Sequence, residues 1–221
     1  MFTGIIESTG VIRKILSRGQ GRILAIEAGM ALEGTKIGDS IAVNGACLTV
    51  VKRGRNSFEV DMSPETVERT SFKRLGPGAA VNIERALRIY DRLDGHLVSG
   101  HIDGTGTVTA IKKKSNALVV TISMSPFPTD EIIEKGSVAI DGISLTINTC
   151  SDHDFEISVI PHTADITTIS THKPGDVVNI ETDMIGKYVK RVMQTHLADK
   201  NNEGAPHGRV NMELLAKKGF L

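Results

Sequence analysis

The segment Ser40-Ile-Ala-Val-Asn-Gly-Ala-Cys-Leu-Thr49 returns 97 residues later as Ser137-Val-Ala-Ile-Asp-Gly-Ile-Ser-Leu-Thr146, with five of the ten positions identical. The register persists further along the chain, because Val81-Asn-Ile-Glu84 returns as Val178-Asn-Ile-Glu181. A period of this length is too long for one unit of a solenoid and is the size of a small domain. The sequence therefore predicts two homologous domains in tandem, over residues 1–97 and 98–184.

Each copy has the pattern of short β-strands. Ser57-Phe-Glu-Val-Asp-Met62 and Ala80-Val-Asn-Ile-Glu84 alternate apolar and polar residues, which is typical of half-buried strands. About six such strands fit in each copy, and Asn44-Gly45 is a hairpin-turn signal. Pro64 and Pro161 each open one or two helical turns. We expect a small closed antiparallel barrel in each copy, since closure removes exposed edges; a sandwich of the same strands is the alternative.

The second copy continues into a segment that the first lacks. A C-terminal amphipathic helix is predicted over residues 185–199, followed by a tail over 200–221. Its apolar stripe either packs on the preceding barrel or joins copies of the chain. The stripe consists of Ile185, Tyr188, Val189, Val192, Met193, His196 and Leu197.

Charge and composition exclude several classes of protein. The chain has 26 basic and 26 acidic residues, so nothing indicates binding to nucleic acid or to an anionic membrane. The run Lys112-Lys-Lys114 is better explained as a solvated hairpin tip. No apolar stretch approaches the roughly 18 residues of a membrane span. The N-terminus lacks a secretory signal and the cysteines form no disulfide framework, so we expect a cytoplasmic protein.

No common catalytic motif is present. The chain has no Walker motif, no strand–GxGxxG–helix unit, no metal-ligand spacing and no G-x-S-x-G elbow, so a nucleotide or metal site is not expected. Thr49 and Thr146 are polar in apolar surroundings and could bind a ligand. The copies differ in chemistry at other positions, where a lone Cys or His is more often structural. These differences are Cys47 against Ser144, Asn44 against Asp141, Glu65 against His162 and Ile5 against His101.

A set of motifs resembles the riboflavin synthase family of the α-subunit type, from residue 1 to about 197. The motifs are Met1-Phe-Thr-Gly-Ile-Ile-Glu7, Asn44-Gly-Ala-Cys-Leu-Thr-Val50, Gly95-His-Leu-Val-Ser-Gly-His-Ile-Asp103, Asp141-Gly-Ile-Ser-Leu-Thr146 and Val178-Asn-Ile-Glu-Thr-Asp183. The resemblance implies two six-stranded Greek-key barrels, a C-terminal helix and a homotrimer. It also implies the final step of riboflavin biosynthesis: four-carbon transfer between two molecules of 6,7-dimethyl-8-ribityllumazine, giving riboflavin and 5-amino-6-ribitylamino-2,4-pyrimidinedione without a metal or organic cofactor.

The resemblance also implies the site residues, with lumazine and riboflavin as ligands. His101 would be the base, Ser40, Cys47 or water the nucleophile, and Asp183 would assist proton transfer or bind the partner pocket. The first barrel's pocket would use Gly4, Ile5, Ile6, Ser40, Cys47, Leu48, Thr49, Met62, Ser63, Glu65 and Thr66. The second barrel's pocket would use Gly100, His101, Ile102, Lys135, Ser144, Leu145, Thr146, Ile160, Pro161, His162 and Thr163.

Two rival functions exist for barrels of this kind. A non-catalytic lumazine- or flavin-binding protein would be expected to lose polar residues from one pocket, whereas Thr49, Thr146 and His101 are all present. A ferredoxin-reductase-like oxidoreductase needs a nicotinamide domain after the barrel, and only about 40 residues follow Glu181. The sequence favours the synthase.

Overall fold

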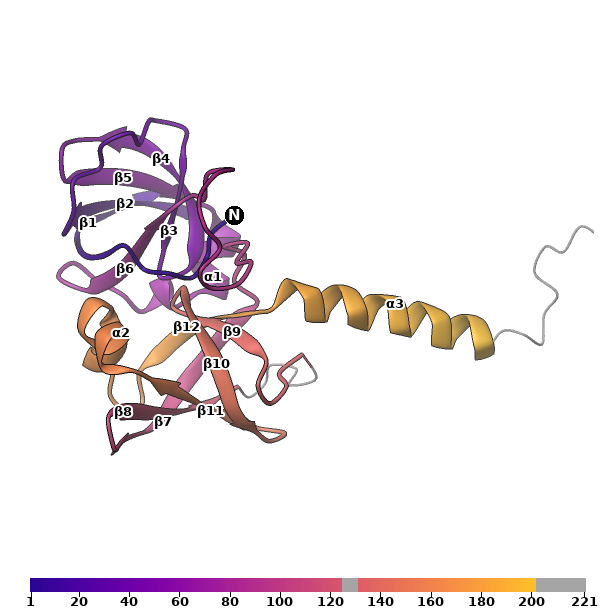
Figure 1. The fold of residues 1–221 in the computed structure, drawn as a ribbon. Helices are drawn as coiled ribbons and strands as arrows, with labels where there is room; N and C mark the ends of the chain where they lie inside the picture. Colours follow the sequence, from indigo (N-terminus) through magenta and orange to yellow (C-terminus); the bar gives the residue numbers. More distant parts are fainter. Residues whose placement is uncertain (125–130, 202–221) are drawn as a thin grey trace, which may run out of the picture. The chain divides into compact units, whose positions relative to one another are not determined.

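The computed structural model describes residues 1–124 and 131–201, with the side chains of 196–201 left aside. Within these residues, two closed antiparallel barrels follow one another along the chain (Figure 1). The predicted tandem barrels are confirmed, and the sandwich alternative is wrong because each sheet closes on itself. Most of the expected tail over 200–221 lies outside the described residues.

The two barrels have the same topology. The first closes in the order β1-β2-β5-β4-β3-β6, and the second closes equivalently as β7-β8-β11-β10-β9-β12. The first barrel consists of β1 (Ser8–Arg18), β2 (Gly21–Ala28), β3 (Ser40–Val43), β4 (Ala46–Arg53), β5 (Ser57–Met62) and β6 (Ala80–Arg85). The second consists of β7 (Gly104–Lys114), β8 (Ala117–Ser123), β9 (Ser137–Ile140), β10 (Ile143–Cys150), β11 (Asp154–Val159) and β12 (Val177–Thr182).

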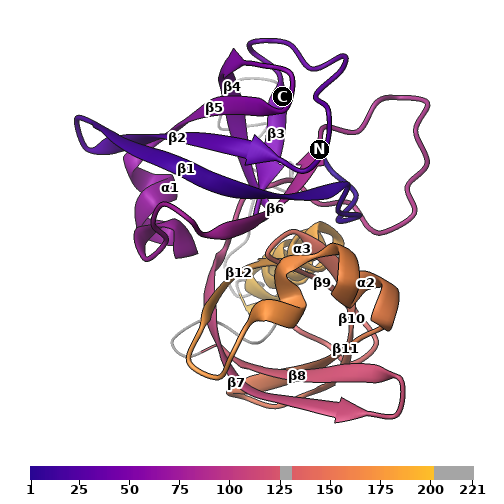
Figure 2. The ribbon, with the colours of Figure 1, turned by 90° about the vertical axis from the view of Figure 1, so that its left-hand side faces the viewer.

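Each barrel also has one short helix, as predicted from Pro64 and Pro161. These helices are α1 (Pro64–Arg69) and α2 (Pro161–Ile166), each with proline in its first turn. Short 3₁₀ turns, η1 (Ser71–Lys73) and η2 (Thr168–Thr171), follow them. Figures 1 and 2 show α1 and α2 on opposite sides of the two-barrel body.

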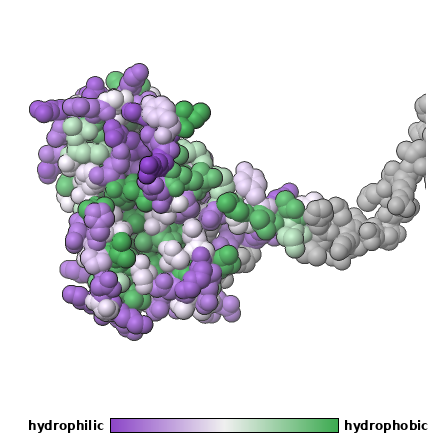
Figure 3. All heavy atoms as spheres, in the orientation of Figure 1, coloured by the Kyte–Doolittle hydropathy of each residue, from purple (hydrophilic) through white to green (hydrophobic). Residues whose placement is uncertain are grey.

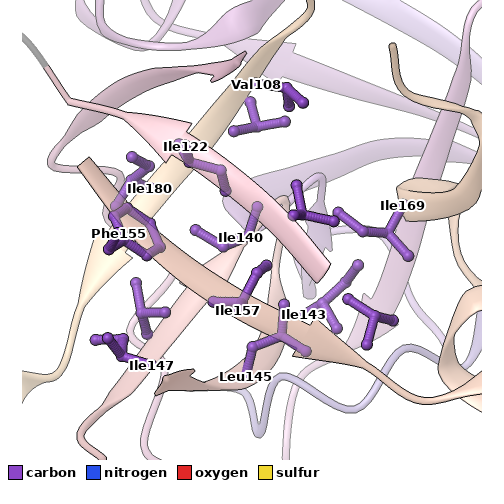
Figure 4. Close-up of a cluster of buried hydrophobic side chains, with 14 of the residues drawn as sticks. Val108, Ile122, Ile140, Ile143, Leu145, Ile147, Phe155, Ile157, Ile169 and Ile180 are labelled. Atoms are coloured by element: carbon purple, nitrogen blue, oxygen red, sulfur yellow. The ribbon is translucent and has the colours of Figure 1, made fainter. Parts of the chain in front are cut away.

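Strand alternation places the cores inside the barrels. In β5, Phe58, Val60 and Met62 are buried while the residues between them are less so. The second barrel is filled mainly by β-branched side chains around Phe155, among them Ile122, Ile140, Ile157 and Ile180 (Figure 4). Such residues pack well on a pleated surface, so pattern and packing agree. The Lys112–Lys114 run ends β7 at a hairpin tip, as expected.

The barrels are joined by a reciprocal pair of asparagines. Asn82 donates from Nδ2 to the Asp141 carbonyl at 3.0 Å, and its Oδ1 accepts from the Thr168 N–H at 2.8 Å. Asn179, its counterpart in the repeat, donates to the Asn44 carbonyl at 2.8 Å and accepts from the Ser71 N–H at 2.7 Å. All these groups are buried, so each bond also satisfies a backbone group that would otherwise be costly to bury.

The two β-hairpin turns meet between the asparagines. Gly45 and Gly142 both have positive φ, 79° and 81°. A Cβ atom on either would lie 2.7 Å from the backbone nitrogen of the other. Glycine is therefore required here both for the turn and for the close approach of the two barrels.

Helix α3 (Met184–Asn201) confirms the predicted amphipathic helix. The chain divides into two units, Met1–Met184 and Ile185–Leu221, so α3 is described by itself. Figure 3 shows apolar residues on its surface. The described apolar side chains of the stripe are 54–68% exposed: Ile185, Tyr188, Val189, Val192 and Met193. The side chains of His196 and Leu197 lie outside the description.

A histidine supports the contact between the barrels on one side only. His172 Nε2 lies 3.0 Å from Asp141 Oδ2, while Asp141 Oδ1 accepts the Asn179 N–H. Burial alone would lower the pKa of His172, but the hydrogen bond and charge of Asp141, helped by Asp176, raise it above the ordinary value. In the first copy Asn44 and Leu75 occupy the equivalent positions, so no such pair forms there.

The raised pKa of His172 predicts a pH-dependent contribution to stability. Because the folded protein binds this proton more tightly, the contribution is full below the unfolded pKa of about 6.5 and is lost as the pH rises through the raised value. We expect His172→Gln to lower the free energy of unfolding by roughly 1.5–3 kcal/mol at low pH and by less at high pH. Urea unfolding from pH 5.5 to 9 measures this. His153→Gln, at an exposed histidine, is the control; a pH-independent difference for His172→Gln would contradict the assignment.

Candidate functional site

Two short arms precede the barrels and pair with each other. The first contains Phe2 and the second contains Val98, and these residues form an antiparallel bridge with N–H to carbonyl distances of 2.7 and 3.1 Å. Phe2 and Val98 are buried against Ala42 and Ala139, one residue from each barrel. The arms therefore begin at the centre of the contact between the barrels.

Each arm continues onto the opposite barrel. The Gly4 carbonyl of the first arm accepts the Ser144 N–H of β10 at 2.7 Å. The Gly100 carbonyl of the second arm accepts the Cys47 N–H of β4 at 2.8 Å. Ile6 is buried in the core of the second barrel, and Ile102 packs on the core of the first. The arms are thus exchanged between the two domains.

Two glycines make this exchange possible. Gly4 and Gly100 have φ values of 75° and 84°, where other residues are strained. A Cβ at Gly4 would lie 2.6 Å from the Ser144 Cβ, and a Cβ at Gly100 would lie 2.5 Å from the Cys47 Cβ. Both glycines were predicted to bind the substrate; their backbones also hold the arm against the strand.

A buried carboxylate fixes each arm. Glu84 of β6 accepts from the Thr3 N–H and hydroxyl at 2.6 and 2.7 Å and from the Gly4 N–H at 3.1 Å. Burial raises the pKa of Glu84, although these hydrogen bonds oppose the shift. Glu181 of β12 binds Ser99 and Gly100 in the same way. Sequence reasoning did not select these glutamates or the two asparagines; the only signal was their recurrence as Val-Asn-Ile-Glu in both copies.

The exchange of arms brings the predicted pair Cys47 and His101 together. A pocket of about 290 Å³ on the first barrel is lined by both residues and by Glu65 and Thr66 of α1. Gly100, Ile102, Ala46, Arg69 and Thr70 complete its wall. Since side chains alternate along β4, Cys47 is half-buried and faces outward, whereas Leu48 points into the core. The pocket therefore lies on the outside of the barrel and joins residues from both domains.

This arrangement corrects the grouping expected from the sequence. Gly100, His101 and Ile102 were assigned to the second barrel's pocket, but they lie against the first barrel. The Gly4–Ile6 arm was assigned to the first barrel's pocket, but it lies against Ser144 of the second. The repeat identifies equivalent residues, and it carries no information on which barrel an arm contacts.

The second barrel has an equivalent surface with different chemistry. Ser144 takes the place of Cys47 beside the Gly4 backbone, and Ile5 takes the place of His101. His162 and Thr163 of α2 correspond to Glu65 and Thr66. Ile160 and Pro161 are exposed at the start of α2, and Leu145 points into the core while Thr146 is exposed. At the positions equivalent to Cys47 and His101, the repeat therefore carries a hydroxyl and an alkyl group in place of a thiol and an imidazole.

His96, which sequence reasoning did not single out, adds a further difference between the surfaces of the two barrels. Its Nδ1 lies 2.7 Å from Ser144 Oγ, and its backbone N–H donates to the Thr3 carbonyl. Burial lowers the pKa of His96, partly offset by the negative charge of Asp183. Its Nε2 is buried without a hydrogen-bond partner among the described residues.

Other predicted residues lie elsewhere on the surface. Ser40 lines a cavity of about 850 Å³ with Ile5, Glu84 and Arg85, not the pocket of Cys47 and His101. Met62 and Ser63 line a hollow of about 540 Å³, where Ser63 Oγ caps α1 by accepting the Thr66 N–H. Thr49 is exposed on the outer face of β4, paired with Ser40 in the ladder. The structure therefore does not gather all the residues expected for the first pocket.

Lys135 and Asp183 lie on the second-barrel side. Lys135 is exposed and has φ 64°, a conformation that Gly38 adopts at the equivalent turn of the first copy. A non-glycine residue in this conformation is uncommon. Asp183 is half-buried directly after β12.

Two classes of feature are missing from the part of the chain that the structure describes. No group of three or more His, Cys, Asp or Glu side chains is arranged to hold a metal ion there. None of the described helices has the length and apolar character needed to cross a membrane.

The chain is similar to known proteins of one class. The family model for the lumazine binding domain matches it twice, over residues 3–86 and 99–183. The class is therefore a tandem lumazine-binding-domain protein. Riboflavin synthase of Bacillus subtilis is 44% identical over the full length of both chains, and that of Bacillus amyloliquefaciens is 47% identical over 92% of this chain and 94% of that protein. The chain belongs to the riboflavin synthase family.

Solved structures agree with this assignment. LumP in complex with 6,7-dimethyl-8-(1'-D-ribityl) lumazine is 28% identical, with a TM-score of 0.74 over 82% of this chain and 99% of that chain. LumP in complex with riboflavin gives the same TM-score at 29% identity.

Proposed function

We propose that this chain is a cofactor-free transferase that converts two molecules of 6,7-dimethyl-8-ribityllumazine into riboflavin and 5-amino-6-ribitylamino-2,4-pyrimidinedione. One molecule donates a four-carbon unit and the other accepts it. The observation that carries the proposal is that equivalent positions carry unlike chemistry: Cys47 and His101 line one pocket on the first barrel, whereas Ser144 and Ile5 occupy the corresponding positions of the repeat. Full-length riboflavin synthase relatives and lumazine-bound LumP support it.

The duplication suits a reaction between two identical molecules. Equivalent surfaces can bind the same ring system, and their differences can give the two molecules different roles. Holding both substrates in place replaces a bimolecular encounter with a preorganised one, for which effective molarities of roughly 10⁵ M or more are attainable. We propose residues 1–97 and 98–184 as the two lumazine-binding domains.

His101 is the group best placed to transfer a proton. It is exposed in the pocket beside Cys47, and histidine exchanges protons near neutral pH. The C7 methyl of the lumazine is acidic because its anion delocalises into the ring, so an imidazole can accept that proton. Cys47 or water supplies the nucleophile that adds at C7 of the donor and starts ring opening. Ser40, in a separate cavity, and Asp183 would act where another chain completes the site.

A binding protein without activity is the second candidate, since LumP is known in complex with lumazine, riboflavin and flavin mononucleotide. Turnover separates the two functions. The purified chain incubated with the lumazine alone should produce riboflavin, detected by its absorbance and fluorescence. Addition of EDTA should leave the rate unchanged, because no metal motif occurs in the sequence. Binding without product would favour the second candidate, and loss of activity restored by a metal would refute the cofactor-free reaction.

Cys47→Ala and His101→Ala are expected to lower kcat much more than they weaken riboflavin binding. For His101→Ala, kcat should fall at least tenfold. General acid–base groups typically contribute a factor of about 10²–10⁴ to kcat, whereas each of these residues is only one of several that line the pocket. Steady-state kinetics and fluorescence titration measure the two effects. Ser144→Ala is the matched variant on the other barrel. A variant that keeps the wild-type kcat would show that its residue only packs in the pocket.

We further propose a cytoplasmic homotrimer, assembled through α3 over residues 185–199. The five described apolar side chains of its stripe are more than half exposed, which favours self-association about an axis. Helix α1, which lines the first barrel's pocket, and helix α2, on the corresponding surface of the second barrel, lie on opposite sides of the body (Figure 2). The working site would then pair the first barrel of one chain with the second barrel of its neighbour.

Truncation after Asp183 should separate assembly from folding. The truncated chain keeps both closed barrels, so it should still bind riboflavin, but it should sediment as a monomer with little synthase activity. Analytical ultracentrifugation and the fluorescence assay test this. Tyr188→Glu in the full chain is a milder variant with the same expected direction. A truncated protein that remains trimeric, or a fully active monomer, would contradict the role of α3.

A further inference from the structure

We propose that Glu181 is a positioning residue that holds His101 in the first barrel's pocket, an inference that rests on the proposed function. Glu181 belongs to β12 of the second barrel, whereas the pocket lies on the first. Its connection to His101 runs through Ser99 and Gly100 of the exchanged arm.

The hydrogen bonds of Glu181 fix the arm directly before His101. Oε1 accepts from the Ser99 N–H at 2.6 Å and from the Ser99 hydroxyl at 2.7 Å, while Oε2 accepts from the Gly100 N–H at 3.0 Å. Ser99 Oγ in turn accepts the His101 N–H at 3.1 Å. The backbone is therefore held at three consecutive residues.

The chemistry of this site requires a carboxylate. Glu181 is only 2% exposed, and Ser99 and Gly100 direct hydrogen-bond donors at both of its oxygens. A glutamine has one acceptor oxygen and an NH₂ group, so one donor would face another donor, and a buried N–H would lose its partner.

The orientation of the His101 side chain depends on this backbone. Its ring is exposed and makes no hydrogen bond within the described chain. What holds His101 is the arm: Glu181 on one side and, on the other, the Cys47 N–H, which donates to the Gly100 carbonyl at 2.8 Å. A small rotation of the arm would move the imidazole relative to Cys47, and misplacement of about 1 Å can cost about 10²-fold in rate.

Glu84 provides an internal control of the same geometry. It binds Thr3 and Gly4 through the same three hydrogen bonds, and the arm that it holds continues to Ile5. Glu84→Gln therefore causes a comparable loss of buried bonds without acting on His101. Its kinetic effects should arise at the second barrel.

The test is a double-mutant cycle in the full chain. Glu181→Gln should lower kcat at least tenfold, with a much smaller change in KM. Combined with His101→Ala, it should cause little further loss, because a misplaced base and a missing base have the same consequence. The loss of kcat caused by Glu84→Gln should instead multiply with the loss caused by His101→Ala. Ser99→Ala, which removes only a hydroxyl, should cause an intermediate loss of kcat.

Several outcomes would overturn the role of Glu181. These are a kcat within twofold of wild type, or losses of kcat that multiply with those of His101→Ala. NMR of the His101 ring gives a readout independent of activity: Glu181→Gln and Ser99→Ala should shift its signals, whereas Glu84→Gln should not. If the wild-type chain makes no riboflavin, the proposed function fails, while the NMR result still decides the positioning role.

Discussion

The structure depends on the reciprocal hydrogen bonds of Asn82 and Asn179 between the barrels. Each amide binds the hairpin turn and the 3₁₀ turn of the opposite domain, and the Gly45–Gly142 contact lies between them. Buried amides tolerate little displacement, since every lost bond leaves a backbone group unsatisfied. This fixes the relative position of two domains that are otherwise separate closed sheets.

Because the two domains are fixed relative to each other, their arms can be exchanged. An arm can reach from one barrel to the strand of the other only if the distance between them is constant, and the glycines at 4 and 100 allow contact at van der Waals range. A pocket built in this way contains residues of both domains, as Cys47 and His101 show. Neither domain alone supplies the complete site, which explains why a buried carboxylate of one barrel can influence chemistry on the other.

The two barrels share one framework but differ in selected side chains, and this is the second constraint on the structure. The framework is repeated in the glutamates, the asparagines and the arm glycines, whereas the groups that face the ligand surfaces differ. Within the described residues, His96 lies beside Ser144 and His172 beside Asp141, whereas Leu75 takes the place of His172 in the first copy. Two identical substrates can therefore bind to similar backbones and meet unlike side chains.

The sequence by itself determined the duplication, the strand pattern, the helix starts at Pro64 and Pro161, and the amphipathic character of residues 185–199, because these follow from local periodicity and turn chemistry. It also indicated Cys47 and His101, through their difference between the copies. Only the tertiary structure decided that His101 lies against the first barrel, that Ser40 lines a separate cavity, and that Glu84, Glu181 and His96 support the sites. Equivalent positions in a repeat look alike in sequence, and the barrel that an arm contacts depends on bonds between residues far apart in the chain.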